Sequence, residues 1–103
     1  MSPEELQQRI GLVIRRHRER LKFSQEGFAA VADIYRTYYG NIERGKQNAS
    51  LGYLQKISVA LNIPLSTLFE QAETLDLDSA VREPPSPPRV GRPPGRRSRW
   101  RSS

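Results

Sequence analysis

Residues 36–44 place hydrogen-bonding side chains on one side of an expected short helix, with no acid among them. In such a helix Tyr39 and Ile42, three positions apart, would be buried. The opposite side would carry the residues that point outward, namely Arg36, Thr37, Gly40, Asn41 and Arg44. Arginine and asparagine bind partners through charge and hydrogen bonds, and an outer side without acids favours an anionic partner.

The composition of the 103-residue chain agrees with that inference. Its length allows one small domain, and its formal charge of +6 with a pI near 10.3 favours a polyanionic partner. The absence of cysteine excludes disulfides, a thiolate nucleophile and cysteine metal ligands. The single histidine, His17, would need carboxylates alone as further metal ligands, or an unseen nucleophile for catalysis. We therefore expect a structural His17, no metal, no cofactor and no enzymatic activity.

No segment is suited to cross a membrane or to direct export. No apolar run approaches the roughly 20 residues that a membrane span requires, and the N-terminus lacks the basic and then apolar order of a signal peptide. The chain also contains no P-loop motif. We expect a cytoplasmic protein without a membrane partner, and no small-molecule ligand is evident.

Two short helices joined by a tight turn would position the outer side described above. Ser24 is a suitable N-cap for the first helix, and the acid in the following turn complements the helix dipole. This helix should end near Asp33. The second helix spans roughly 36–44, and Gly45 fits the position after its end, where a left-handed backbone is needed.

Three further helices are expected, so the predicted class is all-α. The first begins with Ser2 as N-cap and Pro3 at the first helical position, and it should run to about Leu21. Its inner stripe would consist of Leu6, Ile10, Val13, Ile14, His17 and Leu21, whereas Arg9 and the other basic residues should stay near water. Arg18 lies beside the stripe, where an arginine is costly unless it is paired or reaches water along its aliphatic stem.

The two helices after Gly45 complete the expected domain, residues 1–72. Ser50 should cap the fourth helix, whose core stripe is Leu51, Leu54, Ile57, Ala60 and Leu61, and Asn62 should end it. A fifth helix should follow and end near Ala72. A domain of this size has a high surface-to-volume ratio, so some of its apolar residues can exceed what the core buries. We therefore expect a dimer interface that includes Ile63, Leu65, Leu68 and Phe69.

The motifs S-Q-E-x-F-A, R-T-Y and I-E-R-G-K resemble the helix-turn-helix of the lambdoid-repressor superfamily, also called Cro/repressor or XRE-type domains. The run ADIYRTYYGNIERGKQNAS is most similar to the controller proteins of restriction-modification systems. The resemblance covers about residues 6–72. It implies a compact five-helix lambda-repressor-like domain that binds double-stranded DNA and regulates transcription, as a homodimer on a two-fold-related operator.

The same resemblance implies individual roles. Base edges in the major groove would be contacted by Arg36, Thr37 and Asn41, and the DNA backbone by Gln25, Tyr38, Arg44, Lys46 and Gln47. Glu43 matches the motif's acid, which pairs with an arginine of the first helix, here Arg18. The chain departs from the motif at Asp33, Tyr35 and Gly40, where Gly, a capping Ser or Thr, and Ser are usual. A glycine inside a helix costs about 1 kcal/mol relative to alanine.

The composition changes after the expected domain. Residues 73–83 are mildly acidic and read as a linker, and residues 84–103 contain six prolines and six arginines. Such a segment cannot build a core, so we expect a disordered basic tail. Residues 88–93 faintly resemble an AT-hook.

The alternative function is a protein-interaction adaptor that keeps the helix-turn-helix fold and uses this tail to bind RNA or an acidic partner.

Overall fold

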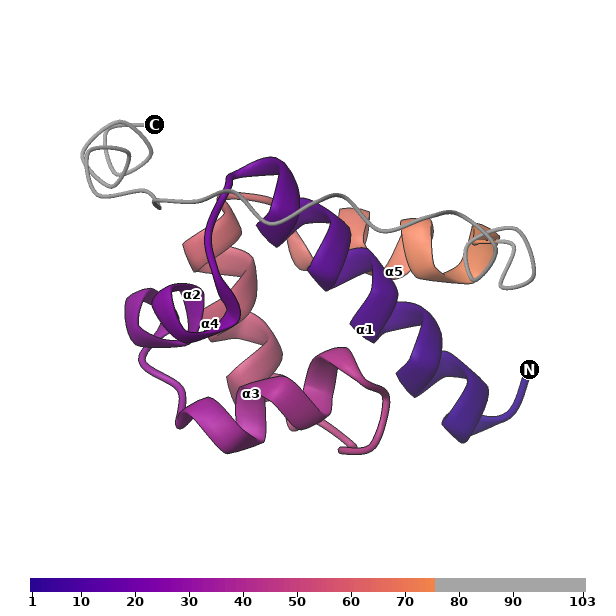
Figure 1. Cartoon of the computed structure of the whole chain (residues 1–103). Coiled ribbons are helices and arrows are strands. Elements are labelled where there is room, and N and C mark those ends of the chain that lie inside the picture. The colour runs from indigo at the N-terminus through magenta and orange to yellow at the C-terminus, as the bar shows by residue number, and fades with distance from the viewer. Residues whose placement is uncertain (76–103) are drawn as a thin grey trace.

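The computed structural model describes residues 1–75, which form five helices and contain no strand (Figure 1). The elements are α1 (Pro3–Arg20), α2 (Gln25–Ala32), α3 (Arg36–Glu43), α4 (Leu51–Leu61) and α5 (Leu65–Thr74). The long helix α1 packs against α3, α4 and α5, while α2 packs against α3 and α4. The predicted all-α, five-helix fold is therefore confirmed. The predicted basic tail, residues 84–103, lies outside the described residues.

Serine side chains begin three of the helices. The hydroxyls of Ser2, Ser24 and Ser50 each accept a hydrogen bond from the backbone N–H three residues further on, at 3.1, 2.9 and 3.2 Å. Each bond satisfies one of the N–H groups that a helix start leaves without a partner, and such a cap typically contributes about 1 kcal/mol. These three N-caps were predicted from the sequence and are confirmed.

A residue in a left-handed backbone conformation follows each of the helices α1 to α4. Asp33 and Asn62 both have φ 60°, and Gly45 has φ 74°. All three were expected to end helices in this way. Lys22 also adopts the left-handed region, with φ 69°, although lysine carries no local signal for that conformation. The turn between α1 and α2 is therefore set by its surroundings rather than by the residue type.

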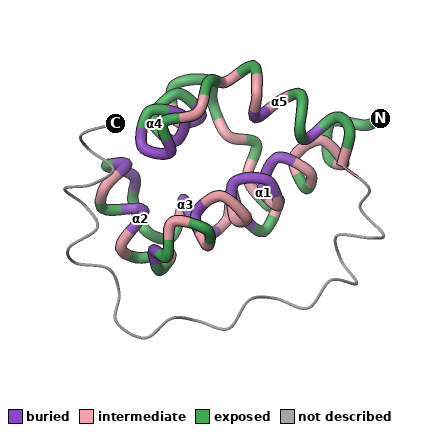
Figure 2. The backbone as a smooth tube through the Cα atoms, turned by 90° about the horizontal axis from the view of Figure 1, so that it is seen from above, coloured by how far each residue is buried: buried purple, intermediate pink, exposed green. Residues whose placement is uncertain are grey.

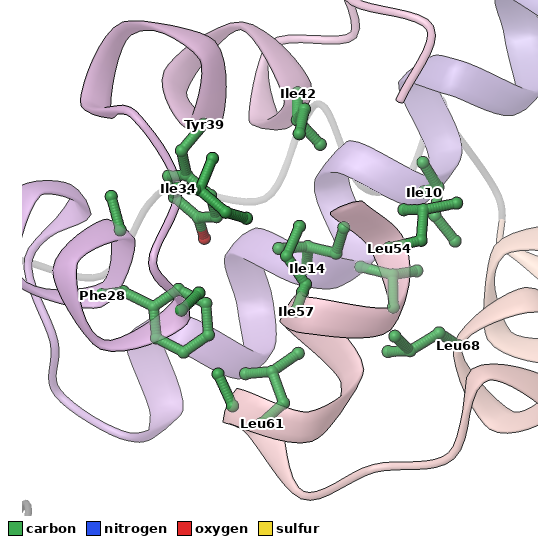
Figure 3. Packing of buried hydrophobic residues seen from close by; sticks show 14 of the residues in the cluster. Ile10, Ile14, Phe28, Ile34, Tyr39, Ile42, Leu54, Ile57, Leu61 and Leu68 are labelled. Atoms are coloured by element: carbon green, nitrogen blue, oxygen red, sulfur yellow. The ribbon is translucent and has the colours of Figure 1, made fainter. Parts of the chain in front are cut away.

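All five helices contribute to one hydrophobic core (Figure 3). Its largest fully buried side chains are Ile14, Phe28, Tyr39, Ile42, Ile57 and Leu68. Buried and exposed residues follow one another along each helix, as amphipathic helices around a single core require (Figure 2). The ring of Phe28 lies between two aromatic neighbours, 5.9 Å from the ring centroid of Phe23 and 5.5 Å from that of Tyr39.

Two apolar residues lie elsewhere than the sequence predicted. Leu51 was expected in the core but is 71% exposed, because it is the first residue of α4 and precedes the turn that packs inward at Leu54. Leu68 was expected in a dimer interface but is fully buried within its own chain. It therefore has no surface to offer a second copy, and it is a core residue.

The end of α5 is tied to α1 by Arg9, which was expected to stay near water. Its Nη1 donates to the carbonyl oxygens of Ala72, at 3.3 Å, and Glu73, at 3.4 Å, and to that of Leu75. Its Nε and Nη2 donate to Oε2 of Glu5 at 3.2 and 2.8 Å. These bonds satisfy carbonyls at the end of α5, which continues to Thr74 instead of ending near Ala72.

Across residues 1–75, none of the helices combines the length and the apolar character that spanning a membrane requires.

Candidate nucleic-acid interface

The outer side of α3 carries the three residues that the sequence assigned to base contact. Arg36 and Thr37 are exposed in its first turn, and Asn41 lies half-buried one turn further on. Gly40 was expected on the same side but is buried. A Cβ there would come within 3.1 Å of the guanidinium of Arg44 and 3.4 Å of Oε1 of Gln25, so these two side chains cover it.

Arg44 and Asn41 hold each other on this surface. Nη2 of Arg44 donates to Oδ1 of Asn41 at 3.0 Å. Because Oδ1 accepts this bond, the NH₂ group of the Asn41 amide is turned away from Arg44. The backbone closes the same region, because the N–H of Lys46 donates to the carbonyl of Asn41 at 2.9 Å.

The other basic residue of the outer side, Arg36, forms an ion pair with Glu26 of α2. Both side chains are largely exposed, at 67% and 63% respectively. The pair links the first turn of α2 to the first turn of α3 across the helix-turn-helix. Nothing in the sequence predicted it, because residues 26 and 36 lie on different helices and no periodic pattern relates them.

Beneath the outer side, the carboxylate of Glu43 joins three helices. Arg18 of α1 donates to it through Nε and Nη2, at 2.7 and 3.0 Å, and also through Nη1 to the carbonyl of Phe23 at 2.8 Å. Gln25 of α2 donates to it through Nε2 at 2.9 Å, and the hydroxyl of Tyr39 donates to it from within α3. The side chains of Arg18 and Glu43 are only 11% and 2% exposed. A carboxylate this buried requires such partners, and they fix the orientation of α3.

Electrostatics in this cluster favour a charged arginine and a neutral tyrosine. Burial lowers the pKa of Arg18, but its hydrogen bond with Glu43 and the charge of that carboxylate raise the pKa by more, so that the net shift is upward. Burial raises the pKa of Tyr39 well above its usual value, and the neighbouring Glu43 carboxylate raises it further. Tyr39 therefore remains a hydroxyl donor at neutral pH.

An aromatic and basic cluster borders the outer side of α3. The ring centroid of Tyr38 lies 4.5 Å from that of Tyr53 on α4, and Nζ of Lys56 lies 5.4 Å from the Tyr53 centroid. Nζ of Lys56 also donates to the carbonyl of Asp33 at 3.0 Å and lies 3.6 Å from its carboxylate. Tyr38 is thus half-buried at the edge of the outer side of α3. Lys56 stabilises the left-handed turn at Asp33, the position where the motif usually has glycine.

The remaining backbone-contact candidates lie at the two ends of the motif. Lys46 is exposed and Gln47 is half-buried, in the loop between α3 and α4. That loop is anchored on α1, where Nε2 of Gln7 donates to the carbonyl of Gly45 at 3.4 Å. Gln25 is half-buried at the start of α2, and its amide has a second N–H beyond the one that Glu43 accepts. The structure thus brings the candidate residues together around α3.

Comparison with known proteins gives the class. A family model described as helix-turn-helix matches residues 14–77. The control protein C.MunI of Mycoplasma sp is 54% identical over 56 residues, which cover 54% of this chain and 76% of that protein. The HTH-type transcriptional regulator SlrR of Bacillus subtilis (strain 168) is 37% identical over 67 residues, covering 64% of this chain and 43% of SlrR.

Among solved structures, the restriction-modification controller protein C.AhdI of Aeromonas hydrophila is similar, with a TM-score of 0.58 and 34% sequence identity. The likeness covers 60% of this chain and 94% of that one. The chain belongs to the helix-turn-helix family. The resemblance to XRE-type domains, and among them to restriction-modification controller proteins, is confirmed.

Proposed function

We propose that this chain, a sequence-specific DNA-binding regulator of transcription, reads its operator with the outer side of α3. In this proposal Arg36, Thr37 and Asn41 face base edges in the major groove. The residues placed against the sugar-phosphate backbone are Gln25, Tyr38, Arg44, Lys46 and Gln47. Arginine suits the acceptor pair of guanine, and asparagine suits the donor and acceptor of adenine.

The observation that carries the proposal is the buried carboxylate of Glu43 beneath the outer side of α3, where Arg36 and Arg44 are exposed. Its bonds to Arg18 and Gln25 hold the helix against α1 and α2. A side chain can distinguish base pairs only if its helix has a fixed orientation in the groove, since discrimination depends on hydrogen-bond geometry. The rival function, an adaptor that binds a protein through this fold, gives no reason for a basic outer side with a rigid support.

We also propose that the protein binds as a homodimer. Ile63, Leu65 and Phe69 are apolar and only partly buried within the chain, so they can contact a second copy. A two-fold dimer would place its α3 helices in major grooves about 34 Å apart. A cytoplasmic location is proposed together with this role, since a regulator of transcription must have access to DNA.

The relatives favour a narrower role. C.MunI is named a control protein and C.AhdI a restriction-modification controller protein. We propose that this chain likewise controls genes of a restriction-modification system. No catalytic activity, cofactor or small-molecule ligand is part of the proposal.

Selection of bound fragments from a pool of random duplexes tests this function. The full chain should enrich a motif with two-fold symmetry and a spacing of about one helical turn between half-sites. Footprinting on an enriched fragment should protect both half-sites at once. Binding that enriches no sequence, or that prefers RNA of equal length, would contradict the proposal and favour the adaptor.

A further inference from the structure

The ion pair between Arg36 and Glu26 places a negative charge beside the candidate base-reading arginine. Nη1 of Arg36 contacts Oε2 of Glu26, and both side chains are more than half exposed. Water screens such a pair, so it contributes little to folding stability. Its position on the candidate interface therefore calls for a role in binding rather than in folding.

The other acids of residues 24–48 have basic partners other than Arg36. The carboxylate of Asp33, whose side chain is 95% exposed, lies 3.6 Å from Nζ of Lys56, and that of Glu43 is buried in the cluster with Arg18. Glu26 is thus the acid of this stretch that meets the candidate base-contacting residues. A carboxylate here repels every DNA phosphate nearby and weakens binding to any duplex, whatever its sequence.

We propose that Glu26 is a positioning residue that sets specificity by controlling what Arg36 can bind. This inference rests on the proposed function, in which Arg36 faces base edges. The carboxylate offsets the charge of the guanidinium, and that offset weakens its attraction to an anionic phosphate more than its hydrogen bonds to the neutral acceptors of guanine. Contacts to the backbone at non-cognate sites lose affinity, while the contact to a guanine edge is retained.

The geometry of a guanidinium allows both contacts at once. It carries five N–H donors in a planar fork, so a contact from Nη1 to Glu26 is compatible with a bidentate contact from the edge formed by Nε and Nη2. Glu26 would also limit the rotation of that fork. The arginine would then reach the groove with its donors already oriented, which lowers the entropic cost of binding.

The test compares wild type with Glu26→Gln, which keeps the size of the side chain and removes its charge. The probes are a duplex selected by the wild-type protein and a shuffled duplex of the same length and composition. Glu26→Gln should bind the shuffled duplex about two- to fivefold more tightly, the range that exposed ion pairs span. Its salt slope on that duplex should increase by up to about 0.9, the contribution of one additional phosphate contact. The ratio of cognate to shuffled affinity should fall.

Two controls separate this role from a structural one. Glu19→Gln removes a charge from another ion pair, 3.0 Å from Arg15 on α1, and should leave the ratio unchanged. In an Arg36→Ala background, Glu26→Gln should no longer alter the ratio, because its effect runs through Arg36. Circular dichroism should show that all of these variants fold.

The outcomes distinguish this inference from the function on which it rests. If the wild-type protein selects no sequence, the proposed function fails and the inference fails with it. If it selects a sequence but Glu26→Gln leaves the ratio unchanged or raises it, the inference alone is overturned. The inference alone is also overturned if Glu26→Gln weakens binding to both duplexes by the same factor, as the loss of a helix-stabilising charge would. It is overturned as well if Glu26→Gln lowers the affinity ratio by the same factor in the Arg36→Ala background.

Discussion

Gly11 of α1 lies directly against the backbone carbonyl of Glu43, at the end of α3. A Cβ at residue 11 would come within 2.5 Å of that oxygen and also within 2.5 Å of the carbonyl oxygen of Ile42. Real Cβ atoms do not approach so closely, and a backbone group cannot move aside as a flexible side chain can. The two helices therefore touch at a point where only glycine fits.

Gly11→Ala should consequently destabilise the protein, although alanine is the better helix former. We expect a loss of about 1 to 3 kcal/mol in the free energy of unfolding, the usual cost of overpacking. Gly52→Ala in α4 is the matched control, since its nearest neighbour would be Oγ of Ser50 at an ordinary 3.8 Å. That change should stabilise by up to about 1 kcal/mol. Urea unfolding measures the change in the free energy of unfolding for both variants. If the two changes have the same sign, the close contact at Gly11 is contradicted.

Removing Arg18 should be costly because it leaves the buried carboxylate of Glu43 without its charged partner. Arg18→Met should lower the free energy of unfolding by about 3 to 5 kcal/mol, as broken buried ion pairs do. Arg15→Met breaks a pair with Glu19 that is far more exposed, and should cost about 1 kcal/mol or less. Chemical denaturation compares the two. Equal costs would mean that the buried pair contributes no more than a surface pair.

Tyr39 should make the stability of the protein fall at alkaline pH. Its pKa is raised in the folded state above the usual 10.0. The folded protein therefore holds the proton more tightly than the unfolded chain does. The stabilisation is complete below pH 10.0 and is lost as the pH rises from there toward the folded pKa.

Tyr39→Phe removes this titration together with the hydrogen bond to Glu43. The variant should be less stable at neutral pH by about 1 to 3 kcal/mol, because a charged acceptor loses a donor. Between about pH 8 and pH 10 the difference from wild type should stay constant, and it should narrow as the pH rises further to about 11. Urea unfolding across this range measures it. Tyr35→Phe, at an 80% exposed position, serves as the control, and a constant difference for Tyr39→Phe would contradict the predicted shift.

Arg36→Ala should weaken binding to the selected operator by about 1 to 3 kcal/mol, the contribution of a bidentate arginine at a guanine edge. Binding to a shuffled duplex should change far less. Fluorescence anisotropy with both duplexes at the same salt concentration measures the two effects. Equal losses on both would assign Arg36 to phosphate contact instead.

Phe69→Glu should convert a dimer into monomers. The side chain of Phe69 is only partly buried in its own chain, so a charge there would meet an apolar partner surface across the proposed interface. Leu51→Glu places the same charge at an exposed apolar site on α4 and should leave the dimer intact. Sedimentation velocity at tens of micromolar distinguishes them. A wild-type protein that is monomeric both free and on DNA would refute the interface.

The features predicted from the sequence depend on local signals. Ser2, Ser24 and Ser50 cap helices because their hydroxyls reach a backbone N–H only three residues away. Asp33 and Asn62 end helices because their own side chains tolerate the left-handed region. Such preferences act over a few residues, so they can be recognised before the fold is known.

The features that were missed depend on contacts between distant residues. Gly11 reads as an ordinary residue of an amphipathic helix until α3 is placed against it. Arg9 reads as a solvated base, yet it binds carbonyls more than 60 residues away, such as that of Ala72 at a separation of 63 residues. Periodicity also placed Leu51 in the core, although it is 71% exposed, and it could not show that the side chains of Arg44 and Gln25 cover Gly40. The period gives the side of a helix and not what lies opposite that side.

The cluster at Glu43 has a consequence for how this protein can diverge. The carboxylate accepts hydrogen bonds from Arg18, Gln25 and Tyr39, so a change at residue 43 affects three helices at once. Arg36 and Thr37 are exposed and form no part of that cluster. Substitutions at these outer positions can therefore accumulate without loss of the fold. In the proposed function, such substitutions would change the operator that the protein binds while the helices that support α3 stay the same, so that new operator preferences could arise through few replacements.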